Sequence, residues 1–254
     1  MNEVGQGGLT RPHPVLPKYY RTDAERAGFV QGLFDRTAPH YDRINQVFSL
    51  GTGGRYRRES LERAGLRAGA QVLDVAVGTG LVAREAAVLV GPSGDVTGLD
   101  VSLGMLAEAR RQLGIPCVQG RAEALPIADA SVDFVSMGYA LRHVPDLVAT
   151  FREYYRVLRP GGTVLVLEIG RPDGRAAYLF ARFYLGGIVP ALCRLAAPRA
   201  ATGTLMSYYW DTIKACVPAE RILAALAEAG LTEVSLETQL GVFRAFSARR
   251  PQTG

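Results

Sequence analysis

The sequence predicts an α/β fold with a doubly wound, mostly parallel β-sheet. Between about residues 71 and 168, short apolar runs alternate with helical segments, and this order builds a parallel sheet. Two final runs, 233–239 and 242–248, are expected to pair as an antiparallel hairpin around Gly241, which brings the sheet to seven strands. With 254 residues and 48% hydrophobic composition, the chain can bury a full core in one domain.

We expect the chain to begin with a mobile tail over residues 1–18, which carry Gly, Pro and polar residues without periodicity. A helical cap follows over residues 19–65, with Asp23 as a candidate N-cap of its first helix. Residues 34–51 are dense in polar and aromatic side chains, which favours a helix over the mouth of a site or, equally, a surface helix docked on the core. The arginines of the next helix, 55–61, are expected to form a solvated face.

The predicted core covers residues 66–172, and the fourth strand is apolar enough to be buried on both faces. A lid or insert is expected over residues 173–218, followed by a C-terminal helix and the hairpin over 219–254. The predicted strands are 71–75, 95–100, 117–120, 132–137 and 163–168, and the predicted helices are 80–89, 102–112, 146–158 and 219–229.

A glycine-containing turn joins the first strand to the first core helix. Gly78 and Gly80 let the backbone approach a ligand, and Asp100 ends the second strand about 20 residues beyond this turn. A carboxylate at that place can accept both hydroxyls of a ribose. The spacing also fits a dinucleotide-binding motif, with Ala83 in place of its third glycine. An oxidoreductase is therefore an alternative function, although nothing later in the sequence resembles a hydride-transfer site.

Charge and cysteine content place limits on partners and location. The net charge of +5 favours contact with an anionic surface, or a solvated arginine-rich surface. Cys117, Cys193 and Cys216 are too far apart to indicate a disulfide framework or a zinc site, which favours a reducing cytoplasm and no metal. The first twenty residues lack the apolar core of a signal peptide, and no run of 18 apolar residues predicts a membrane span.

From about Phe34 to Phe246 the chain resembles the class I S-adenosylmethionine-dependent methyltransferases, and within them the menaquinone/ubiquinone C-methyltransferases. The resemblance implies a Rossmann-like sheet, S-adenosyl-L-methionine as cofactor, and C-methylation of a demethylated prenylquinol. The motifs shared with many methyltransferases are Val72 to Gly80, Asp100, Glu123-Ala124-Leu125-Pro126 and Leu158 to Gly162. The motifs that resemble the quinone enzymes more specifically are Tyr41-Asp42-x-x-Asn45 with Ser49-x-Gly51, Leu141-Arg142-His143-Val144, and Tyr154 to Gly162 running into Leu167-Glu168.

The resemblance also implies a set of cofactor-binding residues. Arg121 departs from the family pattern, because an Asp or Asn is usual beside the adenine amine and a guanidinium has no acceptor to offer. The Arg121 backbone or Glu123 must then accept the hydrogen bond from the adenine amine, or the Arg121 side chain points outward. A second departure is Ala76, which replaces the first glycine of the common Asp-x-Gly-x-Gly-x-Gly motif. The implied set is Asp74, Gly78, Thr79 and Gly80 around the methionyl part, Asp100 at the ribose, Ser102 and Met105 flanking adenine, and Val101, Arg121, Ala122 and Gly138 nearby. For Met105, core packing at helical spacing is an equal alternative.

Three residues are candidates for the methyl-transfer chemistry: Tyr41, Arg142 and His143. In the resembling enzymes the pair at 142–143 reads Arg-Asn, and an imidazole can take a proton where an amide cannot. The hypothesis is that His143 is the general base or orients the water that is; the alternative is a loop histidine that bonds the backbone. Tyr41 would bond a quinol oxygen or merely pack a helix.

Residues 177–195 form an apolar segment broken by Arg182, Gly186-Gly187 and Pro190, which excludes a membrane span. We expect a lid that meets a prenyl tail or the inner membrane face peripherally, with a homodimer contact or ordinary core as alternatives. Residues 207–213 loosely resemble the aromatic segment that covers the family's site. Competing functions are methylation of another hydrophobic molecule, such as a secondary-metabolite phenol or an amino-lipid, and a non-catalytic binding protein. Nucleic acid is disfavoured, since no base-flipping motif is present.

Overall fold

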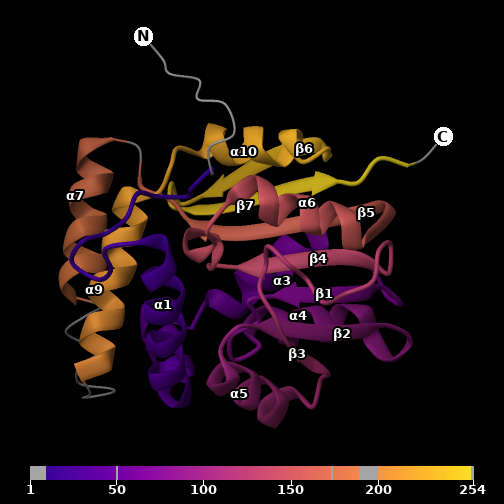
Figure 1. Ribbon diagram of the computed structural model, residues 1–254, viewed down its shortest axis with the longest axis horizontal. Coiled ribbons are helices and arrows are strands. Elements are labelled where there is room, and N and C mark those ends of the chain that lie inside the picture. Colours follow the sequence, from indigo (N-terminus) through magenta and orange to yellow (C-terminus); the bar gives the residue numbers. More distant parts are fainter. Residues whose placement is uncertain (1–9, 50, 173, 189–199, 253–254) are drawn as a thin grey trace.

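The computed structural model describes residues 10–49, 51–172, 174–188 and 200–252 and confirms the α/β fold. Seven strands form one sheet in the order β3-β2-β1-β4-β5-β7-β6 (Figure 1). All neighbours are parallel up to β5, and β7 is antiparallel to both β5 and β6. The strands are β1 Gln71–Val75, β2 Asp95–Asp100, β3 Cys117–Gln119, β4 Val132–Gly138, β5 Leu158–Ile169, β6 Thr232–Gln239 and β7 Phe243–Arg249.

The central strands are apolar because helices cover both faces of the sheet. Strand β1 is parallel to its neighbours β2 and β4, with Asp74 opposite Gly98 on β2 and opposite Ser136 on β4. The three strands therefore end at the same edge of the sheet. Strand β5 begins at Leu158, five residues before the predicted start. The Pro160-Gly161-Gly162 stretch between the predicted helix and the predicted strand lies inside β5, where Gly161 has a φ of +81°.

Two of the core helices, α5 and α6, begin at polar caps. Ser102 Oγ accepts from the Met105 amide at 3.0 Å, and Asp146 Oδ1 accepts from the Ala149 amide at 2.8 Å. The first helix of the chain is capped by Thr22 rather than by the predicted Asp23. The core helices are α4 Leu81–Val90, α5 Leu103–Leu113, α6 Leu147–Val157 and α10 Ala219–Glu228.

The remaining helices, apart from α3, which packs against α4, lie at the sheet edge where the parallel strands end. Figure 1 shows α1 beside α9 at this edge, and the two helices are in contact. Within the described ranges no helix is long and apolar enough to cross a membrane. These helices are α1 Asp23–Thr37, η1 Ala38–His40, α2 Tyr41–Ser49, α3 Gly53–Arg63, α7 Arg175–Phe183, η4 Tyr184–Ile188 and α9 Ala200–Ala215.

The prediction of a mobile tail is wrong for residues 10–18. The Thr10 amide donates to Asp146 at 2.8 Å, and the Thr10 carbonyl accepts from the Leu147 amide at 2.8 Å. The His13 side chain is 1% exposed. These contacts fix the segment because its backbone groups have protein partners. Residues 1–9, and residues 189–195 of the predicted lid with Cys193, lie outside the described residues.

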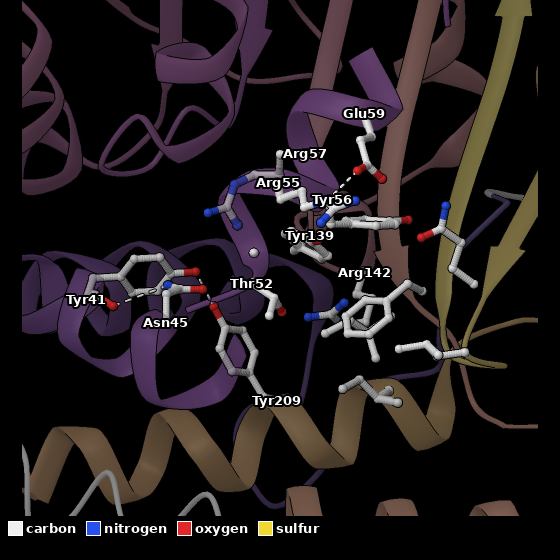
Figure 2. Close-up of a pocket in the computed structure, with 16 residues that line it drawn as sticks. Tyr41, Asn45, Thr52, Arg55, Tyr56, Arg57, Glu59, Tyr139, Arg142 and Tyr209 are labelled. Atoms are coloured by element: carbon white, nitrogen blue, oxygen red, sulfur yellow. Dashed lines mark hydrogen bonds and ion pairs between the residues drawn. The ribbon is translucent and has the colours of Figure 1, made fainter. Parts of the chain in front are cut away.

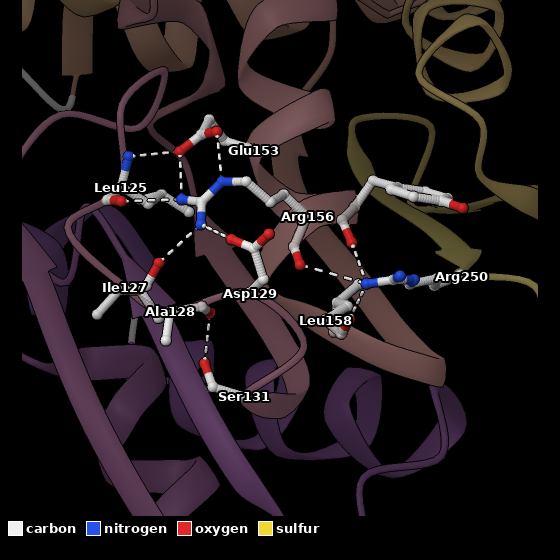
Figure 3. A network of polar contacts seen from close by, with 10 residues as sticks. Leu125, Ile127, Ala128, Asp129, Ser131, Glu153, Arg156, Leu158 and Arg250 are labelled. Carbon is white, nitrogen blue, oxygen red and sulfur yellow. Dashed lines mark hydrogen bonds and ion pairs between the residues drawn. The ribbon is translucent and has the colours of Figure 1, made fainter.

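A polar network around Arg156 of α6 holds the loop after β3 against the domain (Figure 3). Its guanidinium donates to the Leu125 and Ile127 carbonyls at 2.9 and 2.8 Å and pairs with Asp129 at 2.5 Å. Glu153, one turn earlier on the same helix, accepts from the Leu125 amide at 2.7 Å. The loop that precedes these residues, 120–123, is thereby positioned at the edge where ligands bind in such sheets.

Candidate active site

Two cavities lie at the carboxyl ends of the strands. The larger has a volume of about 380 Å³ and the smaller about 290 Å³. Tyr41 and Tyr139 line both, so the cavities meet at these two side chains. The larger cavity is lined by residues that include Arg26, Phe34, Ala76, Gly78, Asp100, Val101, Met105, Arg121, Ala122, Gly138 and His143. The smaller is lined by residues that include Asn45, Tyr56, Arg57, Arg142, Ile169, Tyr209, Ile213, Leu240 and Phe243.

The glycines of the turn have different roles. Gly78 lines the larger cavity with a φ of +56°, and a Cβ built on it would meet nothing within 4 Å. Gly80 points the other way, since its Cβ would come within 2.5 Å of Leu113 Cδ1. Gly78 therefore leaves room for a ligand, whereas Gly80 is needed for helix packing.

Asp100 is placed as predicted. It lines the larger cavity, and its two carboxylate oxygens accept from the Gly78 and Ser102 amides, each at 2.9 Å. Burial raises the pKa of Asp100 to about 6. The backbone bonds leave acceptor capacity on both oxygens for hydroxyl groups of a ligand.

Asp74, Thr79 and Gly80 are not among the residues that line the larger cavity, and their contact with the methionyl part of the cofactor stays a prediction. Asp74 accepts from the Ala83 amide at 3.1 Å and from the Ser136 hydroxyl at 2.6 Å, and burial raises its pKa to about 7. Thr79 donates to Asp42 of α2 at 2.6 Å. Both residues hold the turn in place.

Arg121 lines the larger cavity, yet its side chain is 56% exposed and pairs with Glu123 at 2.5 Å. Glu123 lines the same cavity, and so do Val101, Ala122 and the buried Met105. The Arg121 guanidinium is therefore engaged with Glu123 at the wall of the cavity.

Arg142 is the largest fully buried side chain in the part of the chain that the structure describes. It forms an ion pair with Glu168 at the end of β5 and donates to Thr212 of α9 at 3.3 Å. Burial opposes its charge, yet Glu168 raises the pKa of Arg142 above its ordinary value. Its guanidinium carbon lies 5.5 Å from the centre of the Tyr209 ring. Arg142 thus supplies a fixed positive charge to the smaller cavity.

Tyr41 of α2 and Tyr209 of α9 face one another across the smaller cavity, with their hydroxyls hydrogen-bonded (Figure 2). Burial raises the pKa of both hydroxyls, so both stay protonated. Tyr209 lies in the stretch that loosely resembled the family's aromatic segment. The structure brings this segment over the site.

Sequence reasoning missed Arg57 and Tyr56 of α3. Arg57 was assigned to a solvated face, but it is 9% exposed and lines the smaller cavity. Its Nε and the Tyr56 hydroxyl are buried without a hydrogen-bond partner among the described residues. The signal was present, since Arg57 shares a helix face with buried Ser60 and Leu61 at spacings of three and four.

His143 lines the larger cavity beside the point where the two cavities meet. Its ring stacks on Tyr208, with centroids 5.3 Å apart, and lies 5.5 Å from the Phe34 ring. Its Nδ1 lies 3.3 Å from the Tyr208 hydroxyl, whereas Nε2 is buried without a partner. Burial, helped by Arg142, lowers the pKa of His143 well below 6.5, so the imidazole is neutral.

Two residues at the strand ends have unusual backbone conformations. Ala76 after β1 has a φ of +55°, and Tyr139 after β4 has a φ of +61°. Both line the larger cavity. A positive φ is unfavourable for any residue with a Cβ, so the fold stores backbone strain on two sides of the cavity.

The model of the ubiE/COQ5 methyltransferase family matches residues 21–246. The chain belongs to this family. It is 36% identical over 214 residues to the Ubiquinone/menaquinone biosynthesis C-methyltransferase UbiE of Hahella chejuensis, covering 82% of this chain and 85% of that one. It is 33% identical to the Demethylmenaquinone methyltransferase of Lactiplantibacillus plantarum, covering 82% and 90% of the two chains.

Solved structures share the fold of this ubiE/COQ5 methyltransferase family member. A putative S-adenosyl-L-methionine-dependent methyltransferase of Methanococcus maripaludis matches with a TM-score of 0.63 at 18% identity, covering 87% of this chain and 95% of that one. A Haemonchus contortus phosphoethanolamine N-methyltransferase in complex with S-adenosylhomocysteine matches with a TM-score of 0.61 at 18% identity, covering 87% and 60%.

The family member is an enzyme that uses S-adenosylmethionine, and the larger cavity fits this cofactor. Gly78 leaves space at the turn, and Asp100 offers carboxylate oxygens beside it. Val101 and Ala122 provide apolar contacts for a base. The family match does not support a dinucleotide oxidoreductase. In the described part of the chain no group of His, Cys, Asp and Glu side chains could hold a metal ion.

Proposed function

We propose that this enzyme methylates a ring carbon of a demethylated prenylquinol. The observation that carries the proposal is the smaller cavity: it is apolar on most sides, contains the Arg142 guanidinium, and meets the cofactor cavity at Tyr41 and Tyr139. An aromatic ring bound there would present one edge to the larger cavity. The names of the relatives from Hahella chejuensis and Lactiplantibacillus plantarum support this choice of substrate.

The chain's own residues would prepare both reactants. Asp100 would accept ribose hydroxyls, Gly78 would leave room beside the turn, and Gly138 lines the same cavity. S-adenosylmethionine supplies the methyl group as a sulfonium. Gly138 has a packing role as well, since a Cβ there would come within 2.6 Å of Val82 Cγ2.

The acceptor ring becomes nucleophilic when it loses a phenolic proton. Arg142 and Arg57 both line the smaller cavity, and their positive charges would stabilise the resulting phenolate. The Tyr41 hydroxyl, which stays protonated, would hydrogen-bond a ring oxygen. Arg142 keeps its position because Glu168 and Thr212 hold the guanidinium.

His143 would then take the proton displaced from the methylated carbon. Its neutral state is the one a base needs, and Nε2 has no competing partner within the described structure. The lowered pKa reduces the proton affinity of the imidazole, but a ring carbon that carries both a proton and a new methyl group is a strong acid. His143 is therefore basic enough to accept that proton.

Methylation of a reduced demethylmenaquinone by the purified enzyme tests this function. We expect one methyl group on the quinone ring by mass spectrometry, and accumulation of one demethylated species in cells lacking the protein. A simple phenol and an amino-lipid serve as competing substrates. Preferred methylation of either one would contradict the quinol assignment.

We also propose that α7 and η4 contact the membrane surface peripherally, on its cytoplasmic side. Leu179, Phe183 and Ile188 are 59%, 67% and 37% exposed, and the exposed Arg175 and Arg182 lie on the same segment. Apolar side chains with neighbouring arginines suit an anionic bilayer interface, where the quinol's prenyl tail would be held.

Flotation with liposomes containing an anionic lipid tests this contact. We expect the wild type to float with the liposomes and the double variant Leu179→Glu/Phe183→Glu to remain in the bottom fraction of the gradient. Val88→Glu is the matched control, since Val88 is 59% exposed on α4. If the wild type does not float but sediments as a dimer that the double variant abolishes, the segment is a homodimer contact and the membrane proposal is wrong.

A further inference from the structure

Arg26 of α1 is a buried cation without a carboxylate partner among the described residues. It is 3% exposed and lines the larger cavity. One of its terminal nitrogens donates to the Arg142 carbonyl at 2.6 Å and lies 3.0 Å from His13 Nε2, while its Nε has no partner. The guanidinium thus has donor capacity that the folded chain does not use.

The surroundings of Arg26 add positive charge, and the nearby carboxylates, Asp23 in the same cavity wall and Glu168, form no ion pair with it. Burial and Arg26 itself lower the pKa of His13 to about 4. The carboxylate of Glu168 is already paired with Arg142. Asp23, one turn before Arg26, pairs with Arg11 at 2.7 Å. A buried guanidinium without a counter-ion is unfavourable, which indicates that the cavity receives an anionic group from its ligand.

The position of Arg26 along α1 indicates which part of the ligand this anion belongs to. Asp35 lies near the other end of α1 and accepts from Ser102, next to the ribose-binding Asp100. Nine residues separate Asp35 from Arg26, which is about 13 Å along a helix. Arg26 therefore lies far from the ribose end of the cavity, close to His143 and Arg142.

We propose that Arg26 binds the α-carboxylate of the methionyl part of S-adenosylmethionine. The inference rests on use of this cofactor and not on the identity of the methyl acceptor. The bond would be a charge-assisted one, with the free Nε and a terminal nitrogen of the guanidinium donating to the carboxylate. Arg26 would then fix the amino-acid end of the ligand while Asp100 fixes the ribose.

Isothermal titration with three ligands tests the assignment without any turnover. S-adenosylhomocysteine carries the carboxylate, decarboxylated S-adenosylhomocysteine lacks only that group, and methylthioadenosine lacks the whole amino-acid part. We expect Arg26→Met to weaken S-adenosylhomocysteine at least about 30-fold and to leave methylthioadenosine within about threefold. Arg26→Lys should recover part of the loss. Arg36→Met, an exposed arginine on the same helix, is the matched control.

Equal losses for S-adenosylhomocysteine and methylthioadenosine would overturn the proposal, since they would indicate a structural role. If Arg26→Met does not fold, the same titrations of the wild type and of Arg26→Lys test the proposal. The wild type must prefer S-adenosylhomocysteine over its decarboxylated form at least about tenfold, and Arg26→Lys must narrow that preference. Equal affinity of the wild type for these two ligands, or an unchanged preference in Arg26→Lys, would refute it.

Discussion

Replacing Asp74 by Asn should stabilise the protein near neutral pH. Asp74 is 1% exposed, and its carboxyl group has two hydrogen-bond donors but no cation paired with it. Burial raises its pKa from 3.8 to about 7 in the folded chain. Asn has the shape of the protonated carboxyl group, so Asp74→Asn keeps the Ala83 bond and removes the charge.

The magnitude follows from the difference between the folded and unfolded pKa. Because the folded pKa of Asp74 is the higher one, its contribution to stability is fully present below pH 4 and is lost as the pH rises through 7. Each pH unit in that window changes the unfolding free energy by about 1.4 kcal/mol, so the full loss is about 4 kcal/mol. Between pH 5 and 7 the variant should gain about 3 kcal/mol relative to the wild type.

Urea unfolding of the ligand-free protein from pH 5 to 8 measures this difference directly. The unfolding free energy of Asp74→Asn minus that of the wild type should increase up to pH 7 and then stay level. Asp95→Asn, an exposed substitution on the neighbouring strand β2, controls for the loss of one carboxylate. A difference that stays constant with pH, or that falls as pH rises, would show that Asp74 is not held protonated by burial.

Three further substitutions test other parts of the site. Ala76→Gly should raise the unfolding free energy by about 0.5–1 kcal/mol in urea, since relief of a positive φ outweighs the added chain entropy; a loss would contradict strain at this position. His143→Asn should lower kcat about 100-fold, and turnover like that of the wild type from pH 6 to 9 would exclude His143 as the base. Arg142→Met should destabilise the protein by about 3–5 kcal/mol, because Glu168 is left buried and unpaired. Adding Glu168→Gln should restore much of that stability but no turnover, and recovery of turnover would show that the guanidinium is not needed for the reaction.

The sequence was sufficient to predict the sheet, because strand and helix periodicities alternate and parallel strands must end at one edge. Asp100 ends β2 and Gly78 follows β1 closely, so both were expected at that edge. The pattern could not show that Gly78 lines the larger cavity while Asp74 and Gly80 do not. That difference depends on which side of the turn each residue occupies, and neighbours distant in sequence such as Leu113 and Ser136 decide it.

Residues far from the sheet in sequence were harder to place. Arg57 and Arg26 lie on helices of mixed polarity, where composition favours a solvated face, and only packing against the strands shows that they are buried. Residues 10–18 have no periodic pattern, so their order depends on single bonds to residues over 130 positions away, such as that between Thr10 and Asp146. Such contacts cannot be inferred from local composition.

Tyr41 belongs to the walls of both cavities, and this has a consequence for the order of binding. Helix α2 contributes Tyr41 to the wall of the larger cavity and Tyr41 and Asn45 to one side of the smaller one. A displacement of α2 that admits the donor would also remove this side of the acceptor pocket. For such a displacement we expect a compulsory-order kinetic scheme, with the donor as the leading substrate and its demethylated product as the last to leave.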